Sequence, residues 1–328
     1  MSRLVLVACS PRTPPGVLTW PAWQVLHQGP ALVGDASHVQ LAPLEAAGVT
    51  VEVSARDAGA LLDRARAAGQ VVWLSSGAAD TELVRTLGDP AVRSGVDLEV
   101  VHGSYDAPGA RLLEVVAVMD RLRSPGGCPW DAAQTHSSLA PYLVEESYEL
   151  LQTLEDGDRD GMREELGDVL LQVAFHARLA QEHPSAPFTV DDVAADLVDK
   201  LVRRHPHVFA GGPADDLEGT WDALKAAEKG RTSVTDGVPL GQPALSLASK
   251  LQKRAGRLGA PPRSYDGLPG ELWALVSRCR QAGVDPEAAL RAVARTYRDA
   301  LAAVERDARA AGREPADLTP QEWAERWT

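Results

Sequence analysis

The sequence predicts a mainly α-helical protein that begins with a small α/β domain. Short β-branched runs and one Ala/Leu-rich helical segment alternate within residues 1–108, and four amphipathic segments follow between residues 111 and 205. Aromatic residues make up only 5% of the chain, which also favours helices. A chain of 328 residues is long enough for two or three domains. We expect domains at residues 1–108, 109–231 and 232–328.

The N-terminal region is predicted to contain parallel strands. Four short runs have the β-branched composition of buried strands, at residues 3–8, 49–53, 71–76 and 98–103. The helical segment between the second and third runs predicts a βαβ unit. The first turn, ACSPRTPPG, contains neither a GxGxxG nor a P-loop pattern. We therefore expect a scaffold or an interaction surface in this region, without a catalytic role.

Helical periodicity begins after Asp106. Four consecutive amphipathic segments joined by short connections predict a four-helix bundle, at residues 111–123, 138–155, 159–183 and 189–205. Pro141 is expected in the first turn of the second segment, since proline is tolerated there. Pro184 and Pro206 end the third and fourth segments, and Thr189 is the expected N-cap of the fourth.

Net charge and cysteine content exclude several classes of protein. A formal charge of −13 disfavours general nucleic-acid binding, and an acidic protein that handles phosphates needs a cation. The three cysteines are far apart and form no CxxC pair, so neither a disulfide framework nor a zinc site is predicted. The apolar run at the N-terminus is too short for a secretion signal or a membrane span, so we expect a cytoplasmic protein without membrane contact.

Acidic residues cluster on the second and third helical segments. Glu145, Glu146 and Glu149 fall within an arc of about 100° beside a leucine stripe, because an α-helix turns 100° per residue. Glu165 and Asp168 lie about 60° apart within an apolar surface of the third segment. The ordinary interpretation of such pairs is a solvated helix face. The apolar neighbours disfavour it, because clustered carboxylates repel one another and lose hydration unless a cation binds them.

The type of these ligands predicts the metal. All are hard carboxylate oxygens, and no Cys or His occurs at matching helical spacing, which indicates Mg²⁺, with Mn²⁺ as a second possibility, rather than zinc. Protein-bound Mg²⁺ commonly shares its remaining positions with water and substrate phosphates. Phosphate-ester chemistry is therefore the natural hypothesis.

The acidic pattern and its flanks resemble a known family. EExxE followed by ExxD occurs within the blocks CPWDAAQTHSSLAPYLVEESYEL (128–150) and EELGDVLLQVAFHARLAQ (164–181), and DKLVRRHPHVF (199–209) follows. These blocks are similar to those of MazG-type nucleoside triphosphate pyrophosphohydrolases, over residues 110 to 260. The resemblance implies an all-α, usually dimeric bundle that hydrolyses an NTP or dNTP between its α and β phosphates. The products would be NMP and pyrophosphate. The resemblance thus implies an enzyme that cleans the nucleotide pool.

The resemblance also implies roles for the acidic residues. By position in the motif, the Mg²⁺ ligands would be Glu146, Glu149, Glu165 and Asp168. Glu145 would be a further ligand or would help to orient the attacking water. The nucleophile would be water, with a carboxylate taking its proton.

Candidate substrate contacts are less specific. Lys200, Arg203 and Arg204 either contact phosphates or simply complement the C-terminus of their helix. Trp130 either borders the base or packs in the core, and Gln134 is a candidate for a hydrogen bond to the base. The histidines of this region, His136, His176, His205 and His207, are expected to cap, pack or bond backbone.

A second copy of the motif is expected to be degenerate. Residues 270–290 echo the third segment, with Glu271 at one acidic position, but Leu268 occupies the other and residues 251–267 contain no EExxE. This half-domain is expected to pack or dimerise without catalysing.

Two alternatives to this function stay open. One is a non-catalytic nucleotide-binding or interaction protein that retains the MazG fold. The other is a methyltransferase in the N-terminal domain, whose opening faintly resembles a tetrapyrrole methylase but lacks the donor-binding glycines.

Overall fold

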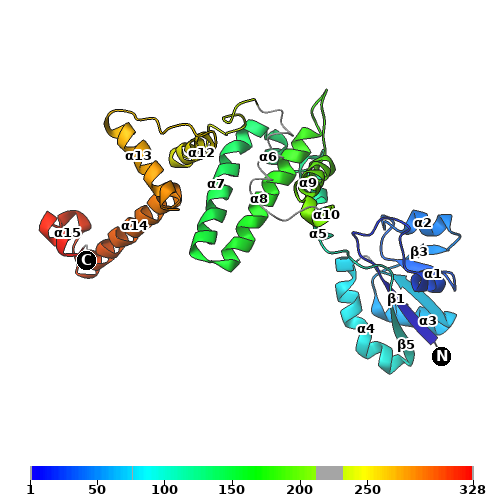
Figure 1. Ribbon diagram of the computed structural model, residues 1–328. Helices are drawn as coiled ribbons and strands as arrows, with labels where there is room; N and C mark the ends of the chain where they lie inside the picture. The colour runs from blue at the N-terminus through cyan, green and yellow to red at the C-terminus, as the bar shows by residue number, and fades with distance from the viewer. Residues whose placement is uncertain (1, 76, 212–231, 327–328) are drawn as a thin grey trace. The chain divides into compact units, whose positions relative to one another are not determined.

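The computed structural model describes residues 2–75, 77–211 and 232–326. It is mainly α-helical with one small parallel sheet, which confirms the fold class predicted from the sequence (Figure 1). The chain separates into two compact units, Met1–Lys200 and Leu201–Thr328. The division into three domains at residues 108 and 231 stays a prediction, and residues 212–231 lie outside the described part.

The N-terminal region is a five-stranded parallel sheet. Its strands are β1 (Ser2–Ala8), β2 (Ala31–Val33), β3 (Val51–Val53), β4 (Gln70–Leu74) and β5 (Val96–His102). They lie in the order β3-β2-β4-β1-β5, and every pairing is parallel. The central strand β1 is buried from Leu4 to Val7. Because side chains alternate along a strand, Leu4 and Leu6 pack on one face and Val5 and Val7 on the other.

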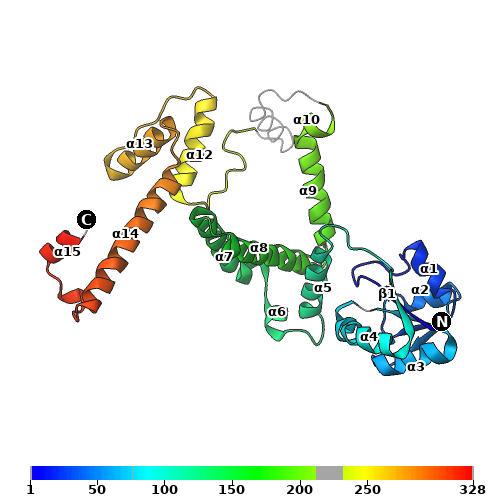
Figure 2. The same cartoon turned by 90° about the horizontal axis from the view of Figure 1, so that it is seen from below.

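Helices cover both faces of this sheet (Figure 2). Side chains of α3 (Ala58–Ala68) and α4 (Thr81–Ser94) join the core cluster of Leu4 and Leu6, whereas α1 (Trp20–Leu26) and α2 (Leu41–Ala46) join that of Val5 and Val7. The 3₁₀ turn η1 (Gly77–Asp80) precedes α4. The four predicted strands are present. The three-residue strand β2 was not predicted, since so short a run carries no periodicity.

An antiparallel helical hairpin forms the centre of the next region. The helices are α5 (Arg111–Arg123), α6 (Pro129–Ala133), α7 (His136–Asp156), α8 (Arg159–Ala180), α9 (Val190–Arg204) and α10 (Pro206–Phe209). Helix α7 packs extensively against α8, and α5 packs against α8 as well (Figure 2). A buried cluster of Met119, Leu139, Phe175 and Leu179 joins these three helices.

Local capping sets the ends of the hairpin. A capping box between Thr135 and Ser138 starts α7 earlier than predicted, so Pro141 lies in the second turn and not in the first. Gly157 ends α7 in the left-handed conformation at φ 68°, and its N–H bonds the carbonyl of Thr153. Asp158 then caps α8. A two-residue connection thereby turns the chain back on itself.

Arg123 ties this region together. Its side chain is only 4% exposed and donates to both carboxylate oxygens of Glu182, at 3.1 and 2.8 Å. It also donates to the carbonyl of Asp131 and lies 5.6 Å from the ring centre of Phe175. Arg123 therefore anchors the end of α5 and the α6 segment to α8. The sequence analysis did not single it out.

The second unit includes the last turn of α9 and α10. Beyond residue 231 it contains α12 (Ala244–Arg257), α13 (Gly267–Gln281), α14 (Pro286–Ala310), η2 (Pro315–Asp317) and α15 (Pro320–Arg326). Helices α12, α13 and α14 contact one another, and Val304, Ala308 and Leu318 form a small core. Gly270 is required by packing, because a Cβ there would lie 1.8 Å from the carbonyl oxygen of Tyr265.

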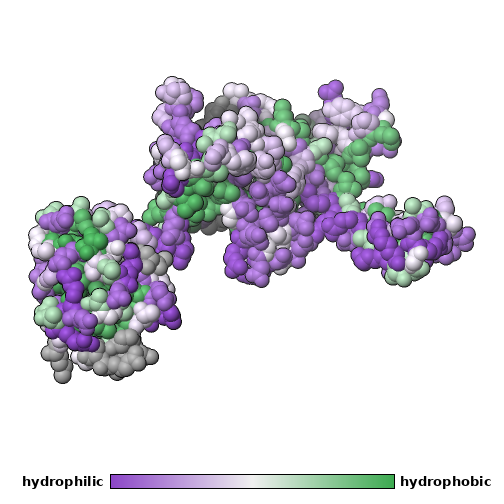
Figure 3. Space-filling model, turned by 180° about the vertical axis from the view of Figure 1, so that it is seen from behind, coloured by the Kyte–Doolittle hydropathy of each residue, from purple (hydrophilic) through white to green (hydrophobic). Residues whose placement is uncertain are grey.

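Hydrophobic residues form patches on the surface of the protein (Figure 3). Among the described helices, none has the length and hydropathy to cross a bilayer.

Two glycine substitutions in the hairpin test this account with opposite signs. Gly157→Ala should lower the free energy of unfolding by about 1–2 kcal/mol, because alanine is strained in the left-handed region. Gly167→Ala should raise it by up to about 1 kcal/mol, because Gly167 is inside α8 with no atom within 4 Å of a new Cβ. Denaturant unfolding measures both, and a change of the same sign in the two variants would contradict the turn assignment.

Candidate metal centre

The α7–α8 hairpin brings three of the predicted acids together. Glu146 of α7 lies opposite Glu165 and Asp168 of α8, and one carboxylate oxygen of each lies within 4.8 Å of the others. Within the described ranges, this is the one group of three His, Cys, Asp or Glu side chains with such spacing. The i, i+3 spacing of the two α8 acids places both on the side that packs against α7.

The electrostatics of the group are unfavourable without a cation. Burial raises the pKa of Glu146 most, and the charge of Asp168 and a hydrogen bond that protonated Glu146 donates to Glu149 raise it further. Burial likewise raises the pKa of Glu165, followed by the charges of Glu149 and Asp168. The Oε2 atom of Glu165 is buried and has no hydrogen-bond partner. An orphaned carboxylate oxygen beside two other carboxylates matches the hard oxygen donors that Mg²⁺ and Mn²⁺ require.

The other two predicted acids stand at the edge of this group. Glu149 hydrogen-bonds Glu146 and its charge acts on Glu165, but it is exposed and lies outside the group of three. Glu145 is also exposed and lies outside that group. The structure therefore provides three converging acids with Glu149 next to them, and the individual catalytic roles stay predictions.

The candidate base contacts lie where α6 joins α7. Trp130 is 53% exposed, and its ring meets that of Tyr142 edge to face at 6.3 Å. The side chain of Gln134 donates to the carbonyl of Trp130 at 3.0 Å and accepts from the hydroxyl of Ser138 at 2.7 Å. The amide nitrogen and the amide oxygen of Gln134 are thus both hydrogen-bonded where α6 joins α7, and a contact of Gln134 with a base stays a prediction.

The basic candidates occupy the end of α9. Arg203 and Arg204 are in its last turn and Lys200 is one turn earlier, as the sequence predicts. Thr189 caps the start of the helix through reciprocal hydrogen bonds with Asp192, which confirms its predicted role. Contact of the three basic side chains with phosphate stays a prediction.

Two polar residues further along α8, Gln172 and His176, were not assigned to the site from the sequence. Gln172 is only 4% exposed, and its Oε1 atom has no hydrogen-bond partner. The Nδ1 atoms of His176 and His136 are 2.7 Å apart with nearly parallel rings, whereas Nε2 of His176 is buried without a partner. Burial lowers the pKa of His176, and the neighbouring His136 lowers it further. The signal was available, because Gln172 and His176 follow Asp168 at intervals of four residues on one face of α8.

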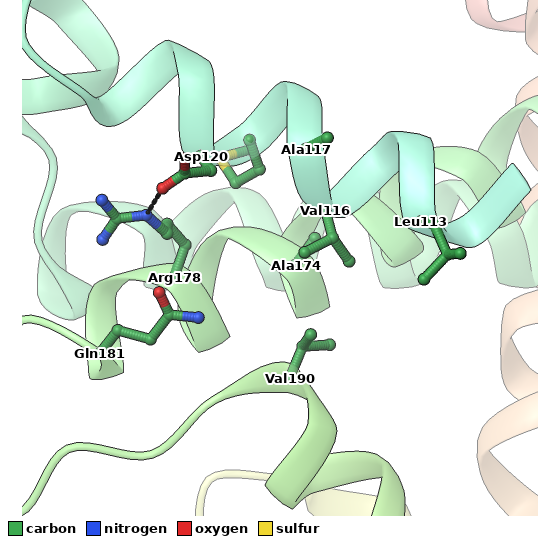
Figure 4. A pocket seen from close by; sticks show the side chains of 9 residues that line it. Leu113, Val116, Ala117, Asp120, Ala174, Arg178, Gln181 and Val190 are labelled. Carbon is green, nitrogen blue, oxygen red and sulfur yellow. Dashed lines mark hydrogen bonds and ion pairs between the residues drawn. The ribbon is translucent and has the colours of Figure 1, made fainter. Parts of the chain in front are cut away.

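A separate pocket of about 320 Å³ lies on the other side of α8 (Figure 4). Leu113 and Val116 of α5, Ala174 of α8 and Val190 of α9 give it an apolar lining. An ion pair between Asp120 and Arg178, at 2.8 Å, closes one end. Ala174 and Arg178 are roughly 180–220° around α8 from Glu165, so the pocket does not share a face with the acidic group.

Comparisons with known proteins agree with the position of the acidic group. Residues 134–209 match the MazG nucleotide pyrophosphohydrolase domain family, and this range includes every acid of the group. The chain is 56% identical over 216 residues to an uncharacterized 26.1 kDa protein encoded in the blaB 3′ region of Streptomyces cacaoi. That alignment covers 64% of this chain and 88% of the Streptomyces protein.

Two relatives that are named nucleoside triphosphate pyrophosphohydrolases are similar over most of their length. A nucleoside triphosphate pyrophosphohydrolase of Mycobacterium tuberculosis is 45% identical over 253 residues, covering 73% of this chain and 75% of that protein. The nucleoside triphosphate pyrophosphohydrolase/pyrophosphatase MazG of Thermotoga maritima is 41% identical over 211 residues, covering 56% of this chain and 81% of that protein.

Metal binding should be visible in thermal melting. Mg²⁺ should raise the Tm, because it binds the folded state alone. The pKa values of Glu146 and Glu165 are raised, so the stability that their protonated forms contribute is lost as the pH rises above the ordinary value of 4.5. The Mg²⁺-induced rise in Tm should therefore grow with pH from about 4.5 to 7, since protons compete with the metal.

A matched pair of variants localises this effect. Glu165→Gln should abolish the Mg²⁺-induced shift and should raise the Tm of the metal-free protein at pH 7, because one repelling charge is removed. Glu164→Gln changes the adjacent, exposed residue and should keep the shift. An equal shift in the two variants would refute the metal site.

Proposed function

Because the chain belongs to the MazG nucleoside triphosphate pyrophosphohydrolase family and is a hydrolase, we propose that it cleaves NTPs or dNTPs to the monophosphate and pyrophosphate with Mg²⁺. The observation that carries this proposal is the convergence of Glu146, Glu165 and Asp168 inside the matched region. Mn²⁺ has the same ligand preference and is expected to substitute for Mg²⁺.

Four carboxylates are proposed to hold the metal. Glu146, Glu165 and Asp168 supply the converging oxygens, and Glu149 completes the set from the next turn of α7. When bound, Mg²⁺ neutralises phosphate charge and lowers the pKa of a coordinated water. The rigid pairing of α7 with α8 keeps the carboxylates in place, so the site is organised before the substrate arrives.

Glu145 is proposed to act on the attacking water. Its exposed carboxylate takes one proton as the water oxygen forms a bond to the α phosphorus. The bond between the α phosphorus and the bridging oxygen breaks, and pyrophosphate leaves. Lys200, Arg203 and Arg204 are proposed to contact the phosphates, and the exposed ring of Trp130 is proposed to border the base.

Surface composition supports a homodimer. On α7, Val144, Tyr148 and Leu154 are 45–55% exposed, and on α8 Leu166 and Val173 are 52% and 43% exposed. So many exposed apolar side chains on one hairpin are typical of an interface between subunits. We propose that a second copy of the chain covers this surface.

The remaining parts are assigned by exclusion and by resemblance. We propose that residues 109–231 form the catalytic domain, that residues 1–108 are a non-catalytic scaffold and that residues 232–328 are a degenerate second copy. The charge of −13 agrees with an enzyme that acts on free nucleotides and not on nucleic acid. A cytoplasmic role in cleaning the nucleotide pool follows from this substrate class.

The reaction is tested with the four common NTPs and four common dNTPs in the presence of Mg²⁺. At least one should yield NMP and pyrophosphate, and in H₂¹⁸O the label should enter the monophosphate, because water attacks the α phosphorus. Asp168→Ala should reduce kcat by at least about a hundredfold, since it removes a metal ligand.

Asp160→Ala is the matched control, because Asp160 is exposed on the same helix and should leave kcat unchanged. Release of NDP and phosphate, or label in pyrophosphate, would contradict cleavage at the α phosphorus. Loss of activity in both variants would contradict the assignment of the site.

The oligomeric state is a separate test. Light scattering of the purified protein should give about twice the chain mass of 34.9 kDa, because the exposed apolar surface of α7 and α8 is buried between two copies. A mass of one chain at micromolar concentration would contradict the dimer.

A further inference from the structure

We propose that Gln172, together with His176, binds the nucleoside of the substrate, next to the metal-binding acids on the α7-facing side of α8. This inference rests on the proposed function, and it assigns the part of the site that accepts a hydrogen bond from the base or the sugar. It is carried by two buried polar atoms that the protein leaves without partners.

These residues continue the line of the acidic group. Glu165, Asp168, Gln172 and His176, here called the polar row, fall within an arc of about 80° on α8. Both ends of the row face α7, since Glu165 and Asp168 meet Glu146 and His176 meets His136. Gln172 is between these ends on the same face, so it lies along the seam between α7 and α8.

The burial of Gln172 has no explanation in packing alone. A carboxamide at 4% exposure loses its water, and its Oε1 atom recovers no hydrogen bond. Such an arrangement costs free energy, whereas an apolar side chain of the same shape costs none. An acceptor that a bound ligand satisfies removes this conflict.

His176 adds a second unpaired atom one turn further on. One proton lies between the Nδ1 atoms of His136 and His176, so one ring donates and the other accepts. The Nε2 atom of His176 carries a hydrogen in one arrangement and a lone pair in the other, so it matches either a donor or an acceptor. Burial, and then the neighbouring His136, lower the pKa of His176 and so favour the neutral ring, which suits an uncharged nucleoside better than a phosphate.

The order of groups along α8 matches the order of groups in a nucleotide. Gln172 and His176 are about 6 and 12 Å along the helix axis from Asp168, at 1.5 Å per residue. The nucleoside is attached directly to the α phosphate, and a metal ion held by the acids would bind the phosphates. The opposite end of the hairpin carries Asp158 and Asp160, whereas residues 169–177 of α8 include no Asp, Glu, Lys or Arg. An uncharged base and sugar therefore fit the Gln172 end.

The Oε1 atom of Gln172 would accept a hydrogen bond from the nucleoside. The donor would be either an N–H group of the base or a hydroxyl of the sugar. A carboxamide also pairs with a base edge through one acceptor and one donor, as glutamine does with adenine. The two sources are separated below by the choice of substrate.

The test compares wild type, Gln172→Leu and the matched control Gln181→Leu, which makes the same change at the C-cap of α8, where Gln181 lines the pocket (Figure 4). For each variant, kcat/KM is measured for the eight common nucleotides and for purine riboside triphosphate, which lacks the amino group of ATP. Inhibition by inorganic triphosphate with Mg²⁺ reports the phosphate and metal end alone. Thermal melting reports folding.

Gln172→Leu should fold with an equal or higher Tm, because it removes an unsatisfied polar group. Its kcat/KM should fall about tenfold or more, mainly through KM, while inhibition by inorganic triphosphate stays within twofold of wild type. A loss confined to certain bases, with ATP and purine riboside triphosphate becoming equivalent, assigns the donor to the base. A loss equal for all eight nucleotides assigns it to the 3′-hydroxyl that they share. Gln181→Leu should match wild type.

Three results would overturn the inference. Unchanged kcat/KM in Gln172→Leu would make the residue a packing feature. An equal loss of affinity for inorganic triphosphate would show that it acts through the metal site. An equal loss in Gln181→Leu would show a general effect on α8. A wild type that hydrolyses none of the eight nucleotides contradicts the proposed function instead, so the two failures are distinguishable.

Discussion

Repulsion between carboxylates is the constraint on which this structure depends. Burial raises the pKa values of Glu146 and Glu165, the neighbouring carboxylate charges raise them further, and Glu165 keeps a buried oxygen without a partner. The apolar contacts between Leu139 and Phe175 and the anchoring of α5 by Arg123 oppose this repulsion. The hairpin thus concentrates unfavourable electrostatic energy at one point, which a bound divalent cation would relieve.

Helical periodicity was enough to predict the elements that carry the site. The segment at 111–123 was predicted with its observed ends, and the helices of the hairpin were predicted to within three residues. Helical spacing placed the acids on defined helix faces, and the family resemblance implied that four of them share a metal. Features that depend on a partner distant in sequence were missed, since no local pattern encodes them. The buried guanidinium of Arg123 and the pairing of His136 with His176 are of this kind.

The polar row divides one helix face into two chemical zones. Its N-terminal end is anionic and suits a metal ion with phosphates, whereas its C-terminal end offers neutral donors and acceptors. A nucleotide has the same division between its charged phosphates and its uncharged nucleoside. The apolar pocket beside α5 is on the opposite side of α8. One face of this helix therefore carries the polar row, and another packs toward α5.

The short connection at Gly157 and Asp158 has a consequence for how the protein is made. All the acids of the site occur within residues 145–168, so the site is assembled from contacts between neighbours in the sequence. Contacts of this kind close quickly, because little chain entropy is lost in a short loop. During synthesis the hairpin can therefore pair as soon as α8 has left the ribosome. The metal ligands would then be in place before the second unit of the chain exists.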